Sequence, residues 1–550
     1  MEEFDKELAP YGILVKIKEK KIISKEKHKI TIDDAEIEEI NFQKLQEADI
    51  KEIRVFGSEV KYLHFLEKNT IKIDFRNCNF KNRIIARDLY FKNEVIFQQC
   101  VFDTVVDFSR TKFGCKIDFS LSIFKNEVKF IRTKFLAKQN DSEIIENNFG
   151  EVICEGKVSF NNSIFKGRVK FLFSKFTNEI RFAKVKFLAK QSDDKIIENN
   201  FEGIIFQARV FFVNSIFQAR VSFRVSKFKD ETFFSNIKLN NHIFHNVEFN
   251  KISFIHNDYM NAKSNTKSYV FQNTIFKDVL SFKRMEFEKL EFEDVLFDGV
   301  VTFSNTKFNA KPQFINCTFS NQFNIEHQYI KYSDKDIENK INNIQDKNDK
   351  FRALLNLRDL FRKLKSNRIA HHNLIDASEL RTQELYAREL ELKYQENKSL
   401  KEKIERWQLS FYHRLCDHHT DLLLNLKWLV VLIGSFALLY FTSRVIQDIN
   451  LLKVLNQYGI CLSIVGVFNL LCLYWFGCIK KFDFFVYFNL IAVLWVICYK
   501  PKIIFGIVNL IGDNSYNGFE NVLITIYTIL LALVLFSLQK TARKNSIVPS

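Results

Sequence analysis

Histidine, cysteine and aspartate residues crowd into nine positions just before an apolar segment. They are His413, Cys416, Asp417, His418, His419 and Asp421. Imidazole, thiolate and carboxylate groups are the ligands that zinc prefers in proteins. A helix would place His413 and Cys416 on one face, and the spacing specifies no third or fourth ligand. We therefore interpret the cluster as polar packing and predict neither a metal ion nor another cofactor.

Motifs of the common enzyme classes are missing from the chain. There is no Walker loop, no dinucleotide-binding fingerprint, no nucleophile elbow and no His-Glu-x-x-His motif. These motifs bring phosphate-binding backbone, activated serine or catalytic zinc to a site. We therefore predict that the protein has no catalytic residues and is not an enzyme.

A basic stretch runs from Lys157 to Lys190, where nine Lys or Arg residues accompany the single acid Glu179. Such a collar could contact a protein, nucleic acid or anionic lipid, or it could be a solvated surface. We take it as the candidate interaction surface. Its central members are Lys166, Arg168, Lys170, Lys175, Arg181, Lys184 and Lys186.

The regular spacing of phenylalanine residues indicates the backbone structure that positions these basic residues. Steps of five and six residues alternate, so the unit has about 11 residues, and a fixed short period is typical of a solenoid. Two positions before each ring stands a Val or Ile in one half-unit and a Ser or Thr in the other, which places both on the inner side of an extended segment. The expected core includes Phe97, Phe102, Phe108, Phe113, Phe119, Phe124, Phe160, Phe165, Phe171, Phe176, Phe217, Phe223, Phe276, Phe282, Phe303 and Phe308.

The tripeptides Cys78-Asn79-Phe80, Cys100-Val101-Phe102 and Cys317-Thr318-Phe319 match the inner positions of a known repeat. On these residues, the chain resembles the pentapeptide-repeat family over residues 71–325. The resemblance implies a mainly β fold, a right-handed quadrilateral β-helix with five residues to a side. The sixth residue on alternate sides of this chain indicates a wider or less regular coil.

Some soluble members of that family imitate duplex DNA with an acidic surface. Residues 71–325 hold 39 basic and 28 acidic side chains, a balance of 39 − 28 = +11. We therefore expect no imitation of DNA, and nucleic acid is not an expected partner.

Two nearly identical inserts interrupt the rhythm, near residues 136–156 and 188–204. The residues that precede them, Phe135 and Phe187, lie 187 − 135 = 52 positions apart, which indicates a duplicated block. Functional residues concentrate on loops carried by rigid scaffolds, so the inserts are candidate contact sites. The alternative is a duplicated bulge without a role.

Three further regions flank the repeats. Residues 1–70 lack the Phe rhythm and are expected to form an N-terminal cap or small domain. Residues 326–425 form a charged α-helical linker, with two helices broken near Ser366–Asn373, that would cap the last coil. Residues 426–540 are mostly apolar, and residues 541–550 form a basic tail.

The apolar region predicts an α-helical transmembrane bundle of about four helices. The expected spans are Trp428–Ile446, Gly459–Phe476, Phe482–Cys498 and Val522–Leu538, each near the length that a bilayer requires. Flanking Lys and Arg residues place both termini and the loop at Lys480–Lys481 in the cytoplasm. Because the chain starts with an acidic segment rather than a secretory signal, we predict a multi-pass protein of the bacterial inner (cytoplasmic) membrane with a cytoplasmic β-helix.

These features favour a non-enzymatic, membrane-anchored scaffold whose β-helix mediates protein–protein interaction. The protein partner is unknown, the bilayer is the second partner, and a homo-oligomer is a further expectation. One alternative is a membrane pore or ion channel with the β-helix as a cytoplasmic sensor. A weaker alternative is docking of nucleic acid or anionic lipid at the basic collar.

Overall fold

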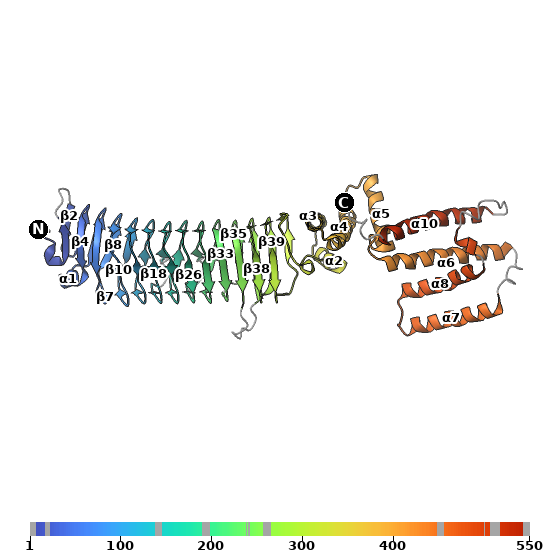
Figure 1. Cartoon of the computed structure of the whole chain (residues 1–550), viewed down its shortest axis with the longest axis horizontal. Coiled ribbons are helices and arrows are strands. Elements are labelled where there is room, and N and C mark those ends of the chain that lie inside the picture. The colour runs from blue at the N-terminus through green and yellow to red at the C-terminus, as the bar shows by residue number, and fades with distance from the viewer. Residues whose placement is uncertain are drawn as a thin grey trace. The chain divides into compact units, whose positions relative to one another are not determined.

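The structure is a computed structural model that describes residues 7–16, 22–137, 146–189, 198–237, 239, 242–256, 266–447, 456–499, 501–505 and 517–542. The chain divides into two compact units, residues 1–330 and 331–550. The first is a β-solenoid of about 12 turns, and the second is helical (Figure 1).

One coil of the solenoid takes 22 residues and passes through four short strands. A typical coil contains β12 (Val95–Gln98), β13 (Val101–Phe102), β14 (Val106–Asp107) and β15 (Lys112–Phe113), which we number as sides 1 to 4. The next strand, β16 (Ile117–Asp118), pairs in parallel with β12, with Val95 opposite Ile117. The period of 5 + 6 residues therefore corresponds to two sides, and the predicted β-solenoid is confirmed.

Sides 1 and 4 form separate parallel ladders through most of the rod. Side 1 contains β2 (Ile22–Glu26), β3 (Lys29–Asp33), β5 (Glu52–Phe56), β8 (Lys72–Arg76), β12, β16, β20 (Glu146–Asn148), β24 (Arg168–Lys170), β28 (Glu198–Asn200) and β32 (Arg220–Ser222). Side 4 contains β7 (Lys68–Asn69), β11 (Tyr90–Phe91), β15, β19 (Lys134–Phe135), β23 (Ile164–Phe165), β27 (Lys186–Phe187) and β31 (Ile216–Phe217). In the later coils a five-stranded sheet takes their place, with β34 (His242–His245), β36 (Thr266–Gln272), β39 (Glu286–Glu293), β42 (Lys307–Phe308) and β43 (Gln313–Ile315).

Sides 2 and 3 belong to one 22-stranded sheet. Side 2 contains β9 (Asn79–Phe80), β13, β17 (Ile123–Phe124), β21 (Ile153–Cys154), β25 (Lys175–Phe176), β29 (Ile205–Phe206), β37 (Ile275–Phe276), β40 (Leu296–Phe297) and β44 (Thr318–Phe319). Side 3 contains β10 (Ile84–Ile85), β14, β18 (Val128–Lys129), β22 (Val158–Ser159), β26 (Ile180–Ala183), β30 (Val210–Val213), β38 (Leu280–Lys283) and β41 (Val301–Ser304). The longer strands β33 (Lys227–Ser235) and β35 (Glu248–Ile255) run through both sides.

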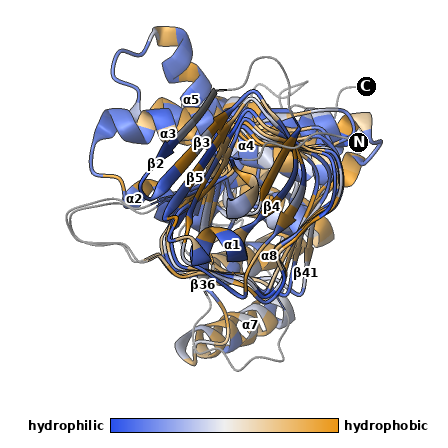
Figure 2. Cartoon of the chain, turned by 90° about the vertical axis from the view of Figure 1, so that its left-hand side faces the viewer, coloured by the Kyte–Doolittle hydropathy of each residue, from blue (hydrophilic) through white to orange (hydrophobic). Residues whose placement is uncertain are grey.

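Stacked phenylalanine rings fill the interior. The ring of Phe97 lies 5.4 Å from those of Phe75 and Phe119, with interplanar angles of 4° and 12°. Rings in such ladders contribute about 0.5–1.5 kcal/mol per pair beyond their burial. Of the predicted core residues, all are buried except Phe308, which is partly exposed in the late coil that carries β42. End-on, the coils show hydrophobic and hydrophilic residues alternating along the chain (Figure 2).

The inner serines and threonines have a specific role. Ser122 Oγ donates to Phe97 O at 2.7 Å, Thr133 Oγ1 donates to Phe108 O at 2.7 Å, and Ser174 Oγ donates to Phe149 O at 2.7 Å. Each hydroxyl is fully buried, so the bond to the carbonyl of the preceding coil offsets its desolvation. This explains why one half-unit uses Ser or Thr where the other uses Val or Ile.

The duplicated inserts lengthen two coils. Phe130 stacks on Phe160 and Phe182 stacks on Phe212, offsets of 30 residues rather than 22. The inserted chain is therefore 30 − 22 = 8 residues long, shorter than the predicted inserts, because β20 and β28 continue the ladder of side 1. The tips at residues 138–145 and 190–197 lie outside the described residues.

The solenoid begins before residue 71, because its first coils use Ile and Val in place of Phe. Ile30 and Ile32 on β3 stack on Ile53 and Val55 on β5, and all four are buried. The N-terminal segment closes the ladder with antiparallel pairs: β1 (Ile13–Lys16) pairs with β4 (Glu36–Asn41), and β2 pairs with β3. β6 (Glu59–His64) follows β4 in parallel. The short helix α1 (Phe42–Glu47) adds Phe42 to the core, and η1 (Ala9–Tyr11) precedes β1.

The helical unit starts with four helices where two were predicted. They are α2 (Asp334–Asn342), α3 (Lys347–Ala370), α4 (Leu374–Tyr394) and α5 (Leu400–Cys416). The break predicted near Ser366–Asn373 is present, since α3 ends at Ala370 and Asn373 caps α4 by accepting from Asp376 N. α2 and α5 begin with capping boxes at Ser333 and Ser399, two signals that the sequence interpretation missed.

Four helices are long and apolar enough to cross a membrane, as predicted. They are α6 (Leu422–Gln447), α7 (Gln457–Trp475), α8 (Lys481–Tyr499) and α10 (Gly518–Ala542). A short 3-10 helix, η4 (Pro501–Ile504), follows α8. α6 packs against α8 and α10. Most of the tail, residues 543–550, lies outside the described part of the chain.

Candidate functional site

The corner between sides 1 and 2 is built from one left-handed residue per coil. These residues have positive φ and are Asn77, Gln99, Leu121, Glu151, Phe173, Gly203, Val225, Asn246, Asn273, Asp294 and Asn316. Their N–H groups donate along the rod, as Leu121 N does to Gly150 O at 2.9 Å and Phe173 N to Glu202 O at 2.9 Å. Asn, Asp and Gly tolerate this conformation, whereas large or β-branched side chains are strained in it.

Three apolar side chains break this local rule at regular intervals. Leu121, Phe173 and Val225 are 39%, 60% and 46% exposed. They lie 173 − 121 = 52 and 225 − 173 = 52 residues apart, the offset of the duplicated block. We call them the apolar corner row. Alternate coils at about 4.8 Å spacing set neighbours roughly 10 Å apart along the rod.

The surroundings of Phe173 support its outward position. A Cβ at residue 203 would lie 2.2 Å from Phe173 Cδ1, so only the glycine of the next coil lets the ring rest there. Ile153 on β21, 36% exposed, pairs with Lys175 on side 2 beside the row. Lys175 thus lies at the edge of a surface that also contains the exposed Glu151, at the corner between Leu121 and Phe173.

The basic collar does not form one patch. Arg168 and Lys170 lie on side 1, Lys175 on side 2 and Arg181 on side 3, so the charges surround the coil. The remaining members belong to side 4 or the corner before it, with Lys166 just after β23, Lys184 at φ 56° and Lys186 on β27.

Acidic neighbours offset part of the collar's charge. Arg168 Nε donates to Glu146 Oε2 at 2.6 Å, and Lys170 Nζ lies 3.7 Å from Glu146 Oε1. Arg181 Nε donates to Glu179 Oε1 at 2.6 Å. Lys170 and Lys175, on the two sides that meet at Phe173, are the predicted interaction residues that flank the apolar corner row.

The juxtamembrane cluster is organised by a strained turn between α5 and α6. Asp417, His418 and His419 are all left-handed, with φ of 48°, 52° and 72°. Each such residue costs about 1–2 kcal/mol, and runs of them are rare. Thr420 Oγ1 secures the turn by donating to Asp417 O at 2.7 Å. Strained backbone of this kind concentrates at functional sites.

His413 forms an ion pair on one side of the cluster. Its Nδ1 lies 3.0 Å from Glu389 Oε2 on α4, and its Nε2 lies 3.8 Å from Asp334 Oδ2 on α2. The carboxylates of Asp334 and Glu389 raise the pKa of His413 to about 10. Burial, together with the charge of His413, lowers the pKa of His418 to about 4. His413 is therefore charged and His418 neutral at physiological pH.

Cys416 and His419 join a buried polar network with Ser537 of α10. Ser537 Oγ lies 3.2 Å from Cys416 Sγ and 3.2 Å from His419 Nδ1, and Asn425 Nδ2 donates to Ser537 Oγ at 2.9 Å. Burial raises the pKa of the Cys416 thiol and lowers that of His419 to about 4. Both groups are neutral, so the pair lacks the thiolate that a cysteine nucleophile needs.

Two sets of side chains in the cluster have ligand atoms within 4.8 Å of one another: Glu389, His413 and His418, and Asp334, His413 and Asp417. Both sets share His413. A metal ion would have to replace the proton of this imidazolium and break its hydrogen bond to Glu389. The arrangement instead links α2, α4 and α5 through an ion pair, in accordance with the expected polar packing.

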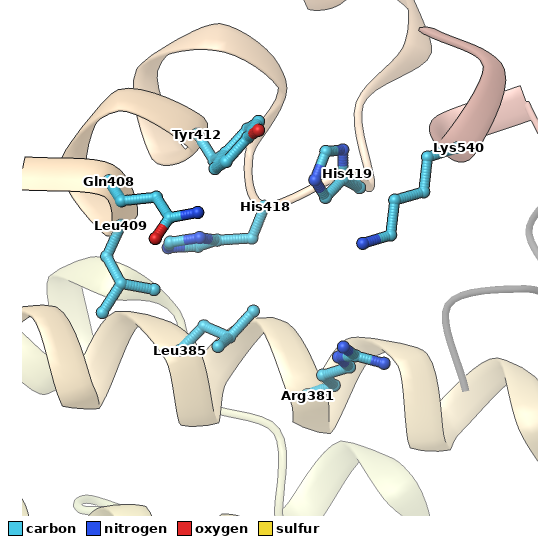
Figure 3. Close-up of a pocket in the computed structure, with 8 residues that line it drawn as sticks. All are labelled: Arg381, Leu385, Gln408, Leu409, Tyr412, His418, His419 and Lys540. Atoms are coloured by element: carbon cyan, nitrogen blue, oxygen red, sulfur yellow. The ribbon is translucent and has the colours of Figure 1, made fainter. Parts of the chain in front are cut away.

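A cavity of about 230 Å³ opens beside the two histidines (Figure 3). Its lining comes from α4, α5, the strained turn and the end of α10. The lining residues are Arg381, Leu385, Gln408, Leu409, Tyr412, His418, His419 and Lys540. Arg381 and Lys540 lie 540 − 381 = 159 positions apart in the sequence, so the sequence could not bring them together.

The apolar corner row could have been found from the sequence. The offset of 52 residues that relates the two inserts also relates Leu121, Phe173 and Val225. What the sequence did not reveal is that these positions are left-handed corners with side chains facing outward.

Comparison with known proteins yields no relative. The chain matches no protein-family model, no curated protein and no solved structure. The functional interpretation therefore rests on the geometry above.

Proposed function

We propose that this chain is a non-enzymatic, membrane-anchored scaffold whose β-solenoid binds a protein partner through the apolar corner row. In this proposal the solenoid is of the pentapeptide-repeat type and lies in the cytoplasm of a bacterium. The apolar helices anchor it in the inner membrane, and the loop at Lys480–Lys481 favours this orientation by the positive-inside rule.

One observation carries the proposal. Leu121, Phe173 and Val225 are exposed and apolar at corner positions where Asn77, Asn273 and other coils use residues suited to positive φ. A residue that breaks a local backbone rule marks a candidate functional position. The cost recurs at three positions spaced by 52 residues, which indicates a repeated contact rather than an isolated irregularity.

The chemistry of the surface suggests the kind of partner. Ile153 lies beside Phe173, the acidic Glu151 occupies the corner between Leu121 and Phe173, and the edge is basic, with Lys175 in the ladder and Arg224 exposed next to Val225. A protein segment with apolar side chains flanked by carboxylates would be complementary to it. Large exposed aromatic side chains are also the residues that contribute most to protein interfaces.

Co-purification from native membranes tests the proposal. Full-length wild-type protein in a mild detergent is compared with the triple variant Leu121→Asn, Phe173→Asn and Val225→Asn. The wild type should recover a stoichiometric second protein and the variant should lose it, because asparagine fits the corner but removes the apolar contact.

A matched control distinguishes this contact from non-specific binding by exposed apolar side chains. Ile85 on side 3 is 53% exposed and lies outside the row. Ile85→Asn should retain the partner at the wild-type level. Equal recovery by wild type and triple variant would contradict the proposal, and recovery of the wild type alone as a closed homo-oligomer would favour a pore instead.

A further inference from the structure

The α5 helix has the composition of a helix that lies in a membrane interface. Leu400, Ile404 and Trp407 follow an i, i+4, i+7 spacing and are 76%, 57% and 71% exposed. Lys401 and Lys403 between them are also exposed. A helix with an apolar stripe of this kind and flanking basic residues inserts its apolar side at the level of the lipid headgroups.

The cavity lies on the inner side of this helix, at the ends of two apolar helices. α6 begins at Leu422, three residues after His419, and Lys540 is in the last turn of α10. Gln408, Leu409 and Tyr412 of α5 line one wall. Because the cavity adjoins α5, a position of α5 among the lipid headgroups places the cavity among them as well.

Two cations of the cavity have no acidic partner. Within the described ranges, neither Arg381 nor Lys540 forms an ion pair with a carboxylate. Both lie close enough to His419 for their charges to lower the pKa of its ring. In Figure 3 the Lys540 ammonium and the Arg381 guanidinium reach toward the space beneath His419. Positive charge gathered without a counter-ion at a cavity favours an anionic ligand.

The histidines add hydrogen-bonding capacity. His419 Nδ1 lies 3.2 Å from Ser537 Oγ, and the ring carries a second nitrogen with hydrogen-bonding capacity. His418 lines the cavity, is 3% exposed, and its Nε2 makes no hydrogen bond to the described part of the chain, with Glu389 Oε2 3.9 Å away. A buried ring nitrogen without a hydrogen bond is available to a bound ligand.

From this geometry we propose that the cavity binds the phosphate group of an anionic phospholipid. The Arg381 guanidinium and Lys540 ammonium pair with the phosphate oxygens, and the ring of His419 lines the same space. Leu385 and Leu409 face the apolar part of the same lipid. Basic pockets between membrane helices bind lipid headgroups by this chemistry. Free phosphate shares the charge but would leave the apolar wall unused.

Native mass spectrometry of the full-length protein tests the site. The protein in detergent is offered phosphatidylglycerol or phosphatidylcholine, and retained lipid is counted. Arg381→Gln with Lys540→Gln should lower phosphatidylglycerol retention by about tenfold or more. Lys112→Gln with Lys134→Gln removes the same charge from exposed positions on the solenoid and should retain the wild-type level. Arg381→Lys with Lys540→Arg keeps the charge and should remain close to wild type.

A second arm distinguishes the source of the phosphate. Inorganic phosphate in the millimolar range is added to the same protein, and thermal stability is measured. Stabilisation by phosphatidylglycerol but not by inorganic phosphate supports the lipid site. Stabilisation by inorganic phosphate alone would overturn the lipid assignment. Equal retention of the two lipids by the wild type, or unchanged retention in the double glutamine variant, would overturn the site altogether.

Discussion

The solenoid and the apolar helices place polar and apolar side chains in opposite ways. In the solenoid, rings such as Phe119 and Phe171 are buried at 0–1% exposure and most charged residues face outward. On α7, Tyr458 and Leu462 are 86% and 77% exposed, whereas Asn425 and Glu520 of the neighbouring helices are fully buried. The difference teaches that burial follows two rules in this chain: the coils bury apolar rings, whereas the four helices that are apolar enough to cross a membrane expose apolar side chains and bury polar ones.

The two regions also differ in the range of their contacts. Each coil contacts residues about 22 positions away, as Val101 pairs with Ile123. Asn425 instead donates to Ser537, 112 positions away. Damage to the solenoid should therefore remain local, whereas damage to the helical unit should spread through it.

The largest expected effect is the removal of one core ring. Phe119→Ala should lower the free energy of unfolding by about 3–5 kcal/mol, because it leaves a cavity among stacked rings. Hydrogen exchange should accelerate in coils around residues 97–149 and remain unchanged in α3 and α4. Phe173→Ala is the matched control, since the same substitution at an exposed ring should change stability by about 0.5 kcal/mol or less. Uniform acceleration in both units would contradict local folding of the coils.

In the apolar helices, removal of the buried charge of Glu520 corresponds to removal of a core ring in the solenoid. Arg444 Nε lies 3.1 Å from Glu520 Oε1, and Ser443 and Gln447 donate to the same oxygen. Glu520→Ala should destabilise the protein in detergent by about 3 kcal/mol, because Arg444 then loses its carboxylate. Removing both charges with Arg444→Met and Glu520→Leu should cost less. Equal thermal stability of the single variant and the wild type would show that the pair is not a structural contact.

Above pH 6.5, a pH series should distinguish the stability of the helical unit, which contains His413, from that of the solenoid. His413 binds a proton in the folded state up to a pKa of about 10, against 6.5 when unfolded. Its stabilisation is complete below pH 6.5 and declines by at most about 1.4 kcal/mol per pH unit above it. Thermal unfolding measured from pH 6.5 to 9 should show this decline in the wild type, and His413→Gln should abolish it.

Below pH 6.5 both units should lose stability. Burial lowers the pKa of His418 and His419 to about 4, and that of His242 in the solenoid to about 3. The unfolded chain binds protons that these folded rings do not, so the stability falls as the pH falls from 6.5 toward 4. Stability that is constant over this interval would contradict the assignment of neutral, buried rings.

The smallest expected effect is at the apolar corner row. Phe173→Asn replaces a strained left-handed residue by one that tolerates positive φ, and should raise the free energy of unfolding by up to about 1 kcal/mol. Chemical denaturation of wild type and variant measures the change. A loss of stability would mean that the ring serves the fold rather than a partner.

The sequence predicted the coils because each Phe recurs where its ring stacks on the next, as Phe102 does on Phe124 at 4.6 Å. It did not predict the first coils, where Ile30 and Ile53 fill the same space without an aromatic rhythm. It missed α5 as a separate helix, because Leu400, Ile404 and Trp407 form a narrow stripe among charged residues. An exposed stripe carries no sign of a folded protein core.

The candidate sites were less accessible to sequence reasoning. The collar was read from charge density alone, whereas the coil distributes Arg168, Lys175 and Lys186 over three sides. The cavity depends on Arg381 and Lys540, which only the packing of α4, α5 and α10 brings together. Backbone conformation was the second unknown, since φ at Phe173 decides whether its ring is core or surface.

Site-specific photo-crosslinking in native membranes tests the central claim most directly. A photoreactive phenylalanine analogue is introduced at residue 173 and, as a control, at residue 85, both exposed on the solenoid. The account predicts a discrete crosslink to a second protein from residue 173 and none from residue 85. No crosslink from residue 173, or the same products from both positions, would contradict a scaffold that binds its partner through the apolar corner row.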